Sequence, residues 1–376
     1  MQIRTLFFVQ IIVFFAGCVE PYHPKLNDYI EIPVVDGIIT NEAGPYIVTL
    51  SKSSTVYNPE FDPIVGAEVT ISDDLNYEEV LTEIEPGVYS TDPDGIRGKV
   101  GRKYQVTIKK DGKTYQSAFE ELQEPVEIDS VYSKVEYKEN REGLQFYLNT
   151  GNISDNHKQF LYTMVETYKY EADDYPIDYI YVKADSIIIP AYDYIKLIKV
   201  CWKTDKVTQI FTGAANKFSD SKIENFPLHY VNTESKKLFI KYSLLVRQYS
   251  ISNDAYKYWT EIKEQNEKSG SLYVKQPFQL IGNLTDINNP ASIILGYFTV
   301  AGVSQKRYFV NKPTLKFYFD ECKASHQTYL AWLEQEEPPY PAYIKLVVGG
   351  LGKASLNCFD CRSKGGTTNK PDFWED

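Results

Sequence analysis

The amino-terminal segment decides where this chain folds. After the amino terminus and Arg4 comes an apolar run that starts at Leu6. It is about a dozen residues long, well short of the ~20 that a membrane-spanning helix needs. The run ends in Ala-Gly and is followed by Cys18. A short positive region, a short apolar region and small residues at its end are the layout of a secretory signal segment. The sequence therefore predicts that residues 1–17 are removed and that the remainder folds outside the cytoplasm.

The last four residues of this segment, Phe15-Ala16-Gly17-Cys18, resemble a bacterial lipoprotein box. In such a box the chain is cut before the cysteine, whose thiol and new amino group then receive fatty acids. Phe15 departs from the leucine that is usual there. The alternatives are a plain signal peptide, or a buried strand that ends in a chance cysteine. We expect a mature chain tied to a membrane by lipid at Cys18, with a polar tether over residues 18–30.

The composition argues against a nucleic-acid partner and favours β-strands as the main secondary structure. The formal net charge of −11 repels phosphate backbones and anionic lipid, so we expect no nucleic-acid partner. Beyond the signal segment no run is long and apolar enough to cross a bilayer, so the lipid is expected to be the only anchor. With 31 Tyr and 19 Phe the chain is rich in residues that favour strands. These aromatic residues fit sheet surfaces and cores, and the sharper alternative is a platform for sugars or peptides.

Four cysteines remain once Cys18 is assigned to lipid: Cys201, Cys322, Cys358 and Cys361. An even number in an oxidising compartment predicts disulfides, and four cysteines allow three pairings between which the sequence does not choose. The C-x-x-C spacing of the last two also suits a redox pair or half of a zinc site. A redox motif belongs at a helix start, whereas this one lies between Gly-rich loops, and the other two cysteines do not form a second close pair. Structural disulfides are the preferred interpretation, ahead of metal binding and free thiols.

Short alternating runs separated by turn residues fill the first part of the chain after the tether. Seven such runs without helical periodicity predict an Ig-like β-sandwich over residues 31–124. Glu-Pro-Gly and Lys-Asp-Gly are the hairpin signals between them, and Gly87-Val88-Tyr89 resembles the turn and tyrosine of extracellular sandwiches. The expected strands are Ile32–Thr40, Tyr46–Ser51, Ala67–Ser72, Glu79–Ile84, Val88–Ser90, Lys103–Lys109 and Thr114–Ala118.

Residues 125–376 predict a larger, β-rich domain with one clear helix at about 253–268. Ser252 or Asn253 can cap that helix, and its apolar residues recur at helical spacing. Residues 169–199 are expected to be irregular loops or edge strands that form a lid or partner surface. A short helix is expected around 329–335, and Phe373 and Trp374 in the tail are expected to dock on the body. The expected strands are Ile128–Tyr137, Gly143–Leu148, Phe160–Tyr168, Leu238–Tyr249, Ile293–Val300 and Lys306–Val310.

Few residues stand out as sites of chemistry. The sequence contains no H-E-x-x-H, G-x-S-x-G, Walker loop or G-x-G-x-x-G, so we expect no catalytic residues, cofactor or metal. Ser130 and Ser186 follow Asp and precede an apolar residue, a pattern that resembles O-glycosylation sites in Bacteroidota and also arises by chance. Aspartates in the turns of the first domain fit Ca²⁺ ligation less well than simple turn formation. They are Asp62, Asp73, Asp74, Asp92, Asp94 and Asp111.

Several segments together resemble one family, the lipoproteins grouped as domain of unknown function 4249 in Bacteroidota. The segments are Val35–Glu42, Val246–Ser250, Gly282–Leu284, Leu295–Phe298 and Cys358–Cys361 with the tail Gly365–Trp374. The resemblance implies a cell-envelope lipoprotein, often associated with TonB-dependent outer-membrane receptors. It brings no catalytic residues.

We therefore expect a lipid-anchored outer-membrane protein, facing the cell surface or the periplasm. Its expected role is that of a non-catalytic accessory or binding component of an outer-membrane uptake system, with a β-barrel receptor as partner and a glycan or peptide as ligand. Two alternatives stay open. One is a glycan-processing or other envelope hydrolase, which requires a pocket with two carboxylates at glycosidase separation. The other is a structural or adhesive surface lipoprotein.

Overall fold

The computed structural model describes the chain from Glu31 to Glu375 with gaps. The described residues are 31–54, 61–138, 140–151, 153, 159–173, 178–183, 186–188, 198–215, 222–268, 280, 282–319, 322, 325–326, 342–347, 350–354 and 358–375. For 178–188 and 325–354 only the backbone is described. The signal segment, Cys18, the tether and the helix expected around 329–335 lie outside the described residues.

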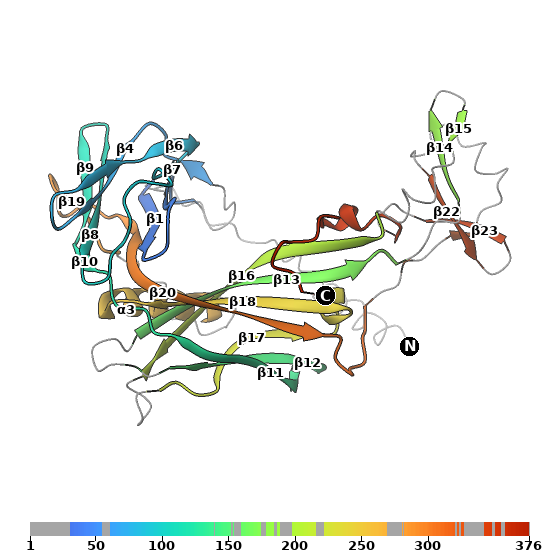
Figure 1. The fold of residues 1–376 in the computed structure, drawn as a ribbon. Helices are drawn as coiled ribbons and strands as arrows, with labels where there is room; N and C mark the ends of the chain where they lie inside the picture. The colour runs from blue at the N-terminus through green and yellow to red at the C-terminus, as the bar shows by residue number, and fades with distance from the viewer. Residues whose placement is uncertain are drawn as a thin grey trace, which may run out of the picture.

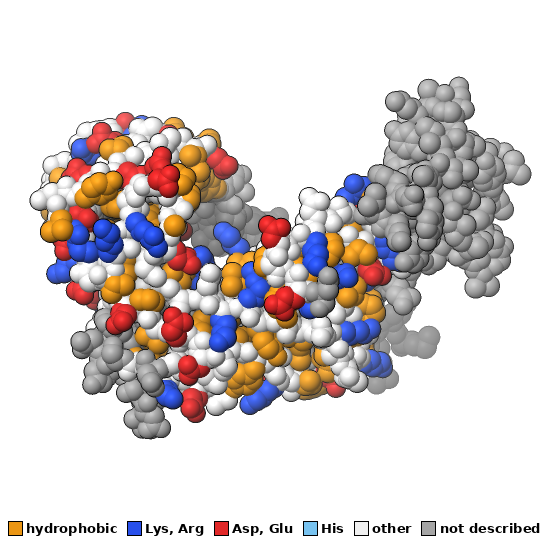
Figure 2. All heavy atoms as spheres, in the orientation of Figure 1, with side chains coloured by type: hydrophobic (Ala, Val, Ile, Leu, Met, Phe, Trp, Pro, Cys, Tyr) orange, Lys and Arg blue, Asp and Glu red, His pale blue; other side chains and the backbone are white. Residues whose placement is uncertain are grey.

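The fold is mainly β, as the alternating pattern predicted. The chain forms two lobes that share one long strand (Figure 1). One lobe is an N-terminal β-sandwich. The other lobe is a larger unit of two layers, here called the body. Figure 2 shows these two parts as distinct globular regions of one continuous surface.

Two facing sheets make up the sandwich. Because hydrophobic residues alternate along these strands, each sheet turns one apolar face inward. The first sheet contains β1 (Pro33–Thr40), β2 (Ile47–Lys52), β3 (Asp62–Pro63), β6 (Thr82–Glu85) and β7 (Val88–Ser90). The second contains β4 (Glu68–Asp73), β5 (Glu78–Val80), β8 (Lys103–Lys110), β9 (Lys113–Ser117), β10 (Glu120–Glu121) and β19 (Leu284–Asp286).

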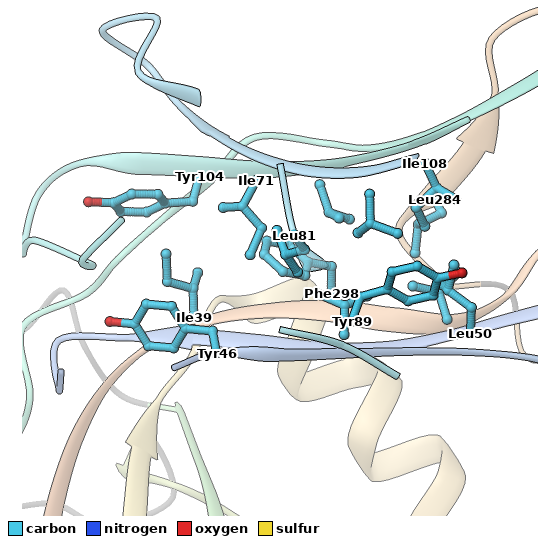
Figure 3. Close-up of a cluster of buried hydrophobic side chains, with 14 of the residues drawn as sticks. Ile39, Tyr46, Leu50, Ile71, Leu81, Tyr89, Tyr104, Ile108, Leu284 and Phe298 are labelled. Carbon is cyan, nitrogen blue, oxygen red and sulfur yellow. The ribbon is translucent and has the colours of Figure 1, made fainter. Parts of the chain in front are cut away.

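A buried cluster between the two sheets forms the sandwich core. Figure 3 shows Ile39, Leu50 and Phe298 from the first sheet facing Ile71 and Ile108 from the second. Tyrosines extend this core, and their hydroxyl groups reach backbone partners at its rim: the Tyr89 hydroxyl donates to Ile64 O (2.9 Å) and accepts from Ala67 N (3.0 Å). Gly87 lies in the turn before β7 and Tyr89 within that strand; the resemblance to the turn and tyrosine of extracellular sandwiches and the Ig-like topology stay predictions.

The second half of the chain completes this sandwich. Strand β20 (Leu295–Asn311) pairs in parallel with β1 through its first seven residues, and β19 pairs with β9. Phe298 and Val300 of β20 are buried in the sandwich core. The strands predicted within residues 31–124 therefore form an incomplete sandwich, because two of its strands come from beyond residue 280.

The body packs three strands against four. The outer layer contains β11 (Ile128–Lys138), β12 (Arg141–Thr150) and β17 (Phe226–Asn232); the long layer contains β16 (Val200–Ala214), β13 (Gln159–Glu171), β18 (Lys241–Ser250) and the second half of β20. Side chains such as Phe146, Tyr162, Tyr242 and Leu244 fill the space between them.

Helix α3 (Asn253–Lys268) has the bounds that the sequence predicted. The Ser252 hydroxyl accepts a hydrogen bond from Ala255 N (3.1 Å), which satisfies one of the free amide groups at the helix start. The apolar face of α3 packs on the side of the shared strand that faces neither the core of the sandwich nor the core of the body. There Ala255 and Tyr258 pack against Tyr297 and Val303.

Five further strands form a separate small sheet at the end of the body far from the sandwich (Figure 1). They are β14 (Asp178–Lys183), β15 (Ser186–Ile188), β21 (Ser325–His326), β22 (Ala342–Val347) and β23 (Gly350–Ala354). Residues 169–199 thus contribute strands here, and their role as a lid or partner surface remains a prediction.

Three predicted elements need correction. The predicted strands Ile293–Val300 and Lys306–Val310 are parts of one continuous strand, β20, because β1 pairs with its first part and β18 with the rest. The central strand begins at Lys241, since Leu238 ends a 3-10 helix, Lys236–Leu238. Glu79–Ile84 splits at buried Leu81, where the chain passes from the second sheet of the sandwich to the first.

Strand β16 was not predicted. Its exposed middle is polar, so no alternating apolar run marks it, and only pairing with β13 identifies it as a strand.

Candidate functional site at the junction of the two lobes

The four predicted disulfide cysteines form two pairs. Cys201 pairs with Cys361 and Cys322 with Cys358, each with 5.6 Å between the Cα atoms. Cys358 and Cys361 therefore do not pair with each other, and each joins a distant part of the chain. Of the three pairings that the sequence left open, this is the one found.

The first disulfide fastens the C-terminal tail to the edge strand β16. Tyr170 donates its hydroxyl hydrogen to Cys361 O, and Trp202 and Thr367 exchange two backbone hydrogen bonds of 2.8 and 2.9 Å. Beyond this bridge Trp374 is buried, with its ring centroid 5.6 Å from that of Phe309. The predicted docking of Trp374 is confirmed.

Phe373 stays half-exposed at the same place. Its ring centroid lies 3.5 Å from the Arg307 guanidinium carbon, so the ring stacks on the body without being buried. The tail is thus held to the body by a disulfide, a backbone bridge and two aromatic side chains.

The structure does not bring the other predicted site residues together. Ser130 is half-buried in β11, where its hydroxyl accepts a hydrogen bond from Asn149 Nδ2 (3.0 Å). Ser186 belongs to β15 and pairs with Lys183 through the backbone, and its side chain lies outside the described residues. Cys18 also lies outside them, so the structure does not test lipidation.

Two of the six aspartates of the sandwich stabilise turns, whereas Asp62 lies in β3 and pairs with Lys52 (3.3 Å). Asp73 Oδ1 accepts hydrogen bonds from Leu75 N (2.9 Å) and Tyr77 N (3.0 Å), and Asp92 Oδ1 accepts one from Asp94 N (2.8 Å). These are the local bonds by which aspartate stabilises turns. Within the described residues, no three His, Cys, Asp or Glu side chains are placed to hold a metal ion.

A buried carboxylate marks the place where sandwich, shared strand and helix meet. Glu120 in β10 is 8% exposed. It accepts hydrogen bonds from the Tyr297 hydroxyl, from Asn283 Nδ2 (3.3 Å) and from the Ser252 hydroxyl (3.3 Å). Burial raises the pKa of the Glu120 carboxyl above its ordinary value, and these neutral donors offset only part of that rise.

Glu120 lines a cavity of about 610 Å³ beside the start of α3. The wall carries further carboxylates, Asp254 and Glu261 from the helix, together with Lys103 and the ring of Phe119. This arrangement can hold a small polar ligand against a carboxylate that gains a proton more readily than usual. No catalytic motif pointed to it, because its residues come from five separate segments.

A second buried carboxylate lies inside the body. Glu166 is 3% exposed and receives hydrogen bonds from Lys237 and from the Tyr242 hydroxyl (2.9 Å), with His229 Nε2 at 3.6 Å. Burial alone would raise the pKa of Glu166, but His229, Lys237 and Tyr242 outweigh it and lower the pKa to about 2. The group therefore stays ionised and acts as a fixed anchor for its neighbours.

The segments that carry the family resemblance meet around the junction. Gly282 and Gly296 allow three backbone segments to touch, since a Cβ on Gly296 would lie 1.8 Å from Val35 O. The Asn283 side chain bonds both backbone groups of Phe298, at 2.9 and 3.0 Å. These residues fix the geometry of the shared strand against the sandwich.

Contacts on the body side of the junction also fix how the sandwich is oriented relative to the body. Arg247 pairs with Glu42 at 2.6 Å, and Asn41 Oδ1 accepts a hydrogen bond from Val303 N (2.6 Å). Gln248 Nε2 donates to Val126 O (2.7 Å), which holds the connection between the lobes. The family segments thus serve to set the relative orientation of sandwich and body.

Three further observations complete the description. Among the described residues no helix has the length and apolarity needed to cross a bilayer. No curated protein matches the sequence. The family described as Domain of unknown function (DUF4249) matches residues 19–307, which leaves the Cys358–Trp374 segments outside the match. Since this match spans well over half of the chain, the protein belongs to the family described as Domain of unknown function (DUF4249).

Proposed function

We propose that this protein is a lipid-anchored, non-catalytic component of the bacterial cell envelope that binds beside a β-barrel receptor of a TonB-dependent outer-membrane uptake system. The observation that carries the proposal is the segment Phe15–Cys18 at the end of an apolar signal run. A cysteine in that setting is acylated and keeps the folded chain at a membrane. The expected location is the outer membrane, with the protein facing the cell surface or the periplasm.

The two disulfides support an extracytoplasmic location. Disulfides persist in oxidising compartments and are uncommon in the cytosol. Cys201–Cys361 joins residues 160 positions apart, so it stabilises the body as a whole rather than one loop.

The junction supports a binding role. A receptor accessory that captures a ligand or gates a channel must present its surfaces in a fixed relation, and the glycine contacts and buried polar bonds around Gly296, Asn283 and Glu120 provide that rigidity. The ligand class remains a glycan or a peptide, as predicted from the aromatic composition.

Lipidation is tested first. The full-length protein and its Cys18→Ser variant are expressed in a Bacteroidota host with an alkyne-bearing fatty acid. The parent is expected to carry the label and to fractionate with outer membranes, and the variant is expected to lose both properties. Equal partitioning of parent and variant, with no label on either, would contradict the proposal.

The partner is tested next with a C-terminally tagged parent. Membranes are extracted in mild detergent, and the tagged protein is purified under conditions that keep the disulfides intact. A β-barrel receptor is expected to co-purify in stoichiometric amount, and the Cys18→Ser variant at the same expression level serves as the control. A monomer without any co-purifying barrel would reject the uptake role while leaving lipidation untouched.

A further inference from the structure

One end of the sandwich combines exposed apolar side chains, a cavity and several lysines. Here β1 begins, β2 ends and β8 turns into β9; in Figure 1 this hairpin lies at the end of the sandwich away from the body. We call this region the sandwich tip and define it by Glu31–Pro33, Leu50–Lys52, Phe61–Val65 and Ile108–Tyr115. These segments surround a cavity of about 410 Å³.

Large apolar side chains are exposed at the sandwich tip. Phe61 is 56% exposed, and Val65, four residues later in the chain, is 48% exposed. Val65 lines the cavity, which reaches the core, since Val35, Leu50 and Ile108 also line it and are almost fully buried. Exposed apolar side chains beside an apolar cavity favour a partner that removes them from water.

Lysines surround this apolar area. Lys52, Lys110 and Lys113 all line the cavity. Lys52 pairs with Glu31 (2.8 Å) and Asp62 (3.3 Å), while the Lys110 ammonium lies 3.8 Å from the position that a Cβ on Gly66 would take, next to Val65. Long side chains of this kind lay their carbon stems along apolar surface and keep the charge at the level of polar headgroups.

The tether enters the fold at the same place. Residues 18–30 directly precede Glu31, which lines the cavity. A segment of about a dozen residues reaches at most about 45 Å even when fully extended. The lipid on Cys18 would therefore hold the sandwich tip, rather than the body, close to the bilayer, because β1 and then β20 lead away from the tip.

We propose that the sandwich tip is a membrane-contact surface, in which Phe61 and Val65 enter the headgroup region of the bilayer that holds the lipid anchor while the lysines remain among the headgroups. The inference rests on the lipid anchoring in the proposed function and adds an orientation: the tip lies on the membrane and the body points away from it. Such contacts supplement a lipid anchor by the apolar area that they bury.

The test separates this contact from natural acylation. The mature chain from Cys18 onward is produced without lipid, and its Cys18 thiol is coupled to a maleimide-headgroup lipid in phosphatidylcholine vesicles, so that the tether is anchored whatever the cell does. Phe61→Trp is then compared with Leu75→Trp on vesicles with and without brominated acyl chains. Leu75 is 70% exposed in the turn at the opposite end of the same sandwich and provides the matched control.

The fluorescence of the parent is subtracted from that of each variant, because the chain has four native tryptophans. The remaining emission of Phe61→Trp is expected to be quenched at least twofold by the brominated lipid, while that of Leu75→Trp is unaffected. A second measurement uses the Cys18→Ser chain, which is not coupled to lipid. Adding Phe61→Ser and Val65→Ser to this chain should lower its partition into vesicles about tenfold, as expected for loss of roughly 1.4 kcal/mol of apolar burial. Equal quenching at both positions, or none at either, overturns the proposal. So does a concentration-dependent dimer in solution that Phe61→Ser abolishes, because the tip would then bind a second copy.

Discussion

The Tyr297 hydroxyl donates a hydrogen bond to the buried carboxylate of Glu120, and this bond ties the strand that both lobes share to the last strand of the N-terminal segment. Tyr297 also packs against Tyr258 of α3, with 4.9 Å between ring centroids. One tyrosine thus connects sandwich, body and helix. The orientation of the lobes depends on a few such residues, and it can be tested one residue at a time.

Replacing Glu120 should loosen the junction. Glu120→Ala leaves the buried Tyr297 hydroxyl without its acceptor, so we expect the free energy of unfolding to fall by about 2 kcal/mol at neutral pH. Urea denaturation followed by circular dichroism measures the change. The neighbouring Glu121 is exposed, and Glu121→Ala should stay within about 0.5 kcal/mol of the parent. Similar losses for the two variants would show that the Glu120 contacts carry no special stability.

Glu166 should make the protein sensitive to acid. Its pKa falls from an ordinary value of 4.5 to about 2 in the folded chain. A carboxyl whose pKa is lowered by folding stabilises the fold above its unfolded pKa, and this contribution is lost as the pH drops from about 4.5 toward 2. The shift corresponds to about 3 kcal/mol. Glu166→Gln should lose most of that stability at pH 7 and show a flatter dependence between pH 5 and 2 in a series of denaturation curves. An unchanged slope would contradict the assignment.

The two disulfides should contribute unequally. Chain-entropy arguments give about 5 kcal/mol for a loop closed over 160 residues and about 4 kcal/mol for one closed over 36. Cys201→Ser with Cys361→Ser should therefore lower the midpoint of thermal unfolding more than Cys322→Ser with Cys358→Ser does. Peptide mapping without reduction checks the pairing itself, and a Cys358–Cys361 crosslink in the parent would refute it.

Gly296 should tolerate no side chain. Its φ is +94°, and a Cβ would lie 1.8 Å from Val35 O, so Gly296→Ala has to separate β20 from β1. We expect a loss of at least about 3 kcal/mol, or failure to fold. Gly112 also has a positive φ, but open space surrounds its Cβ position. Gly112→Ala should cost only about 1 kcal/mol, and comparable costs at both positions would rule out close backbone contact as the cause.

Local sequence patterns predicted much of the secondary structure. Helix α3 was found from its capping residue and its apolar spacing, and strands such as β8 and β12 from alternation, because these signals depend on neighbours in the sequence. Strand β16 escaped notice because its pattern is polar. The pattern predicts two strands on either side of Gly302, whereas β20 continues through it; glycine is needed there because Gln123 O would lie 2.1 Å from a Cβ.

The candidate site at the junction could not be found in this way. Glu120, Ser252, Asn283 and Tyr297 are spread over nearly half of the chain, and each is ordinary in its own segment. Strand pairings between distant segments bring them together: β1 with β20, β18 with β20 and β19 with β9. A buried carboxylate has no local sequence signature, since burial is decided by what the rest of the chain places over it.

By itself the sequence determined which cysteines are available for disulfides, the β-rich class and the long helix α3, and it predicts an export signal and a lipid at Cys18. These follow from composition and from contacts between near neighbours in the chain. Tertiary structure alone decided which cysteines pair, that one strand belongs to both lobes, and which of the many carboxylates are buried. Those outcomes depend on contacts between residues from 36 to more than 200 positions apart, which hydrophobic periodicity does not encode.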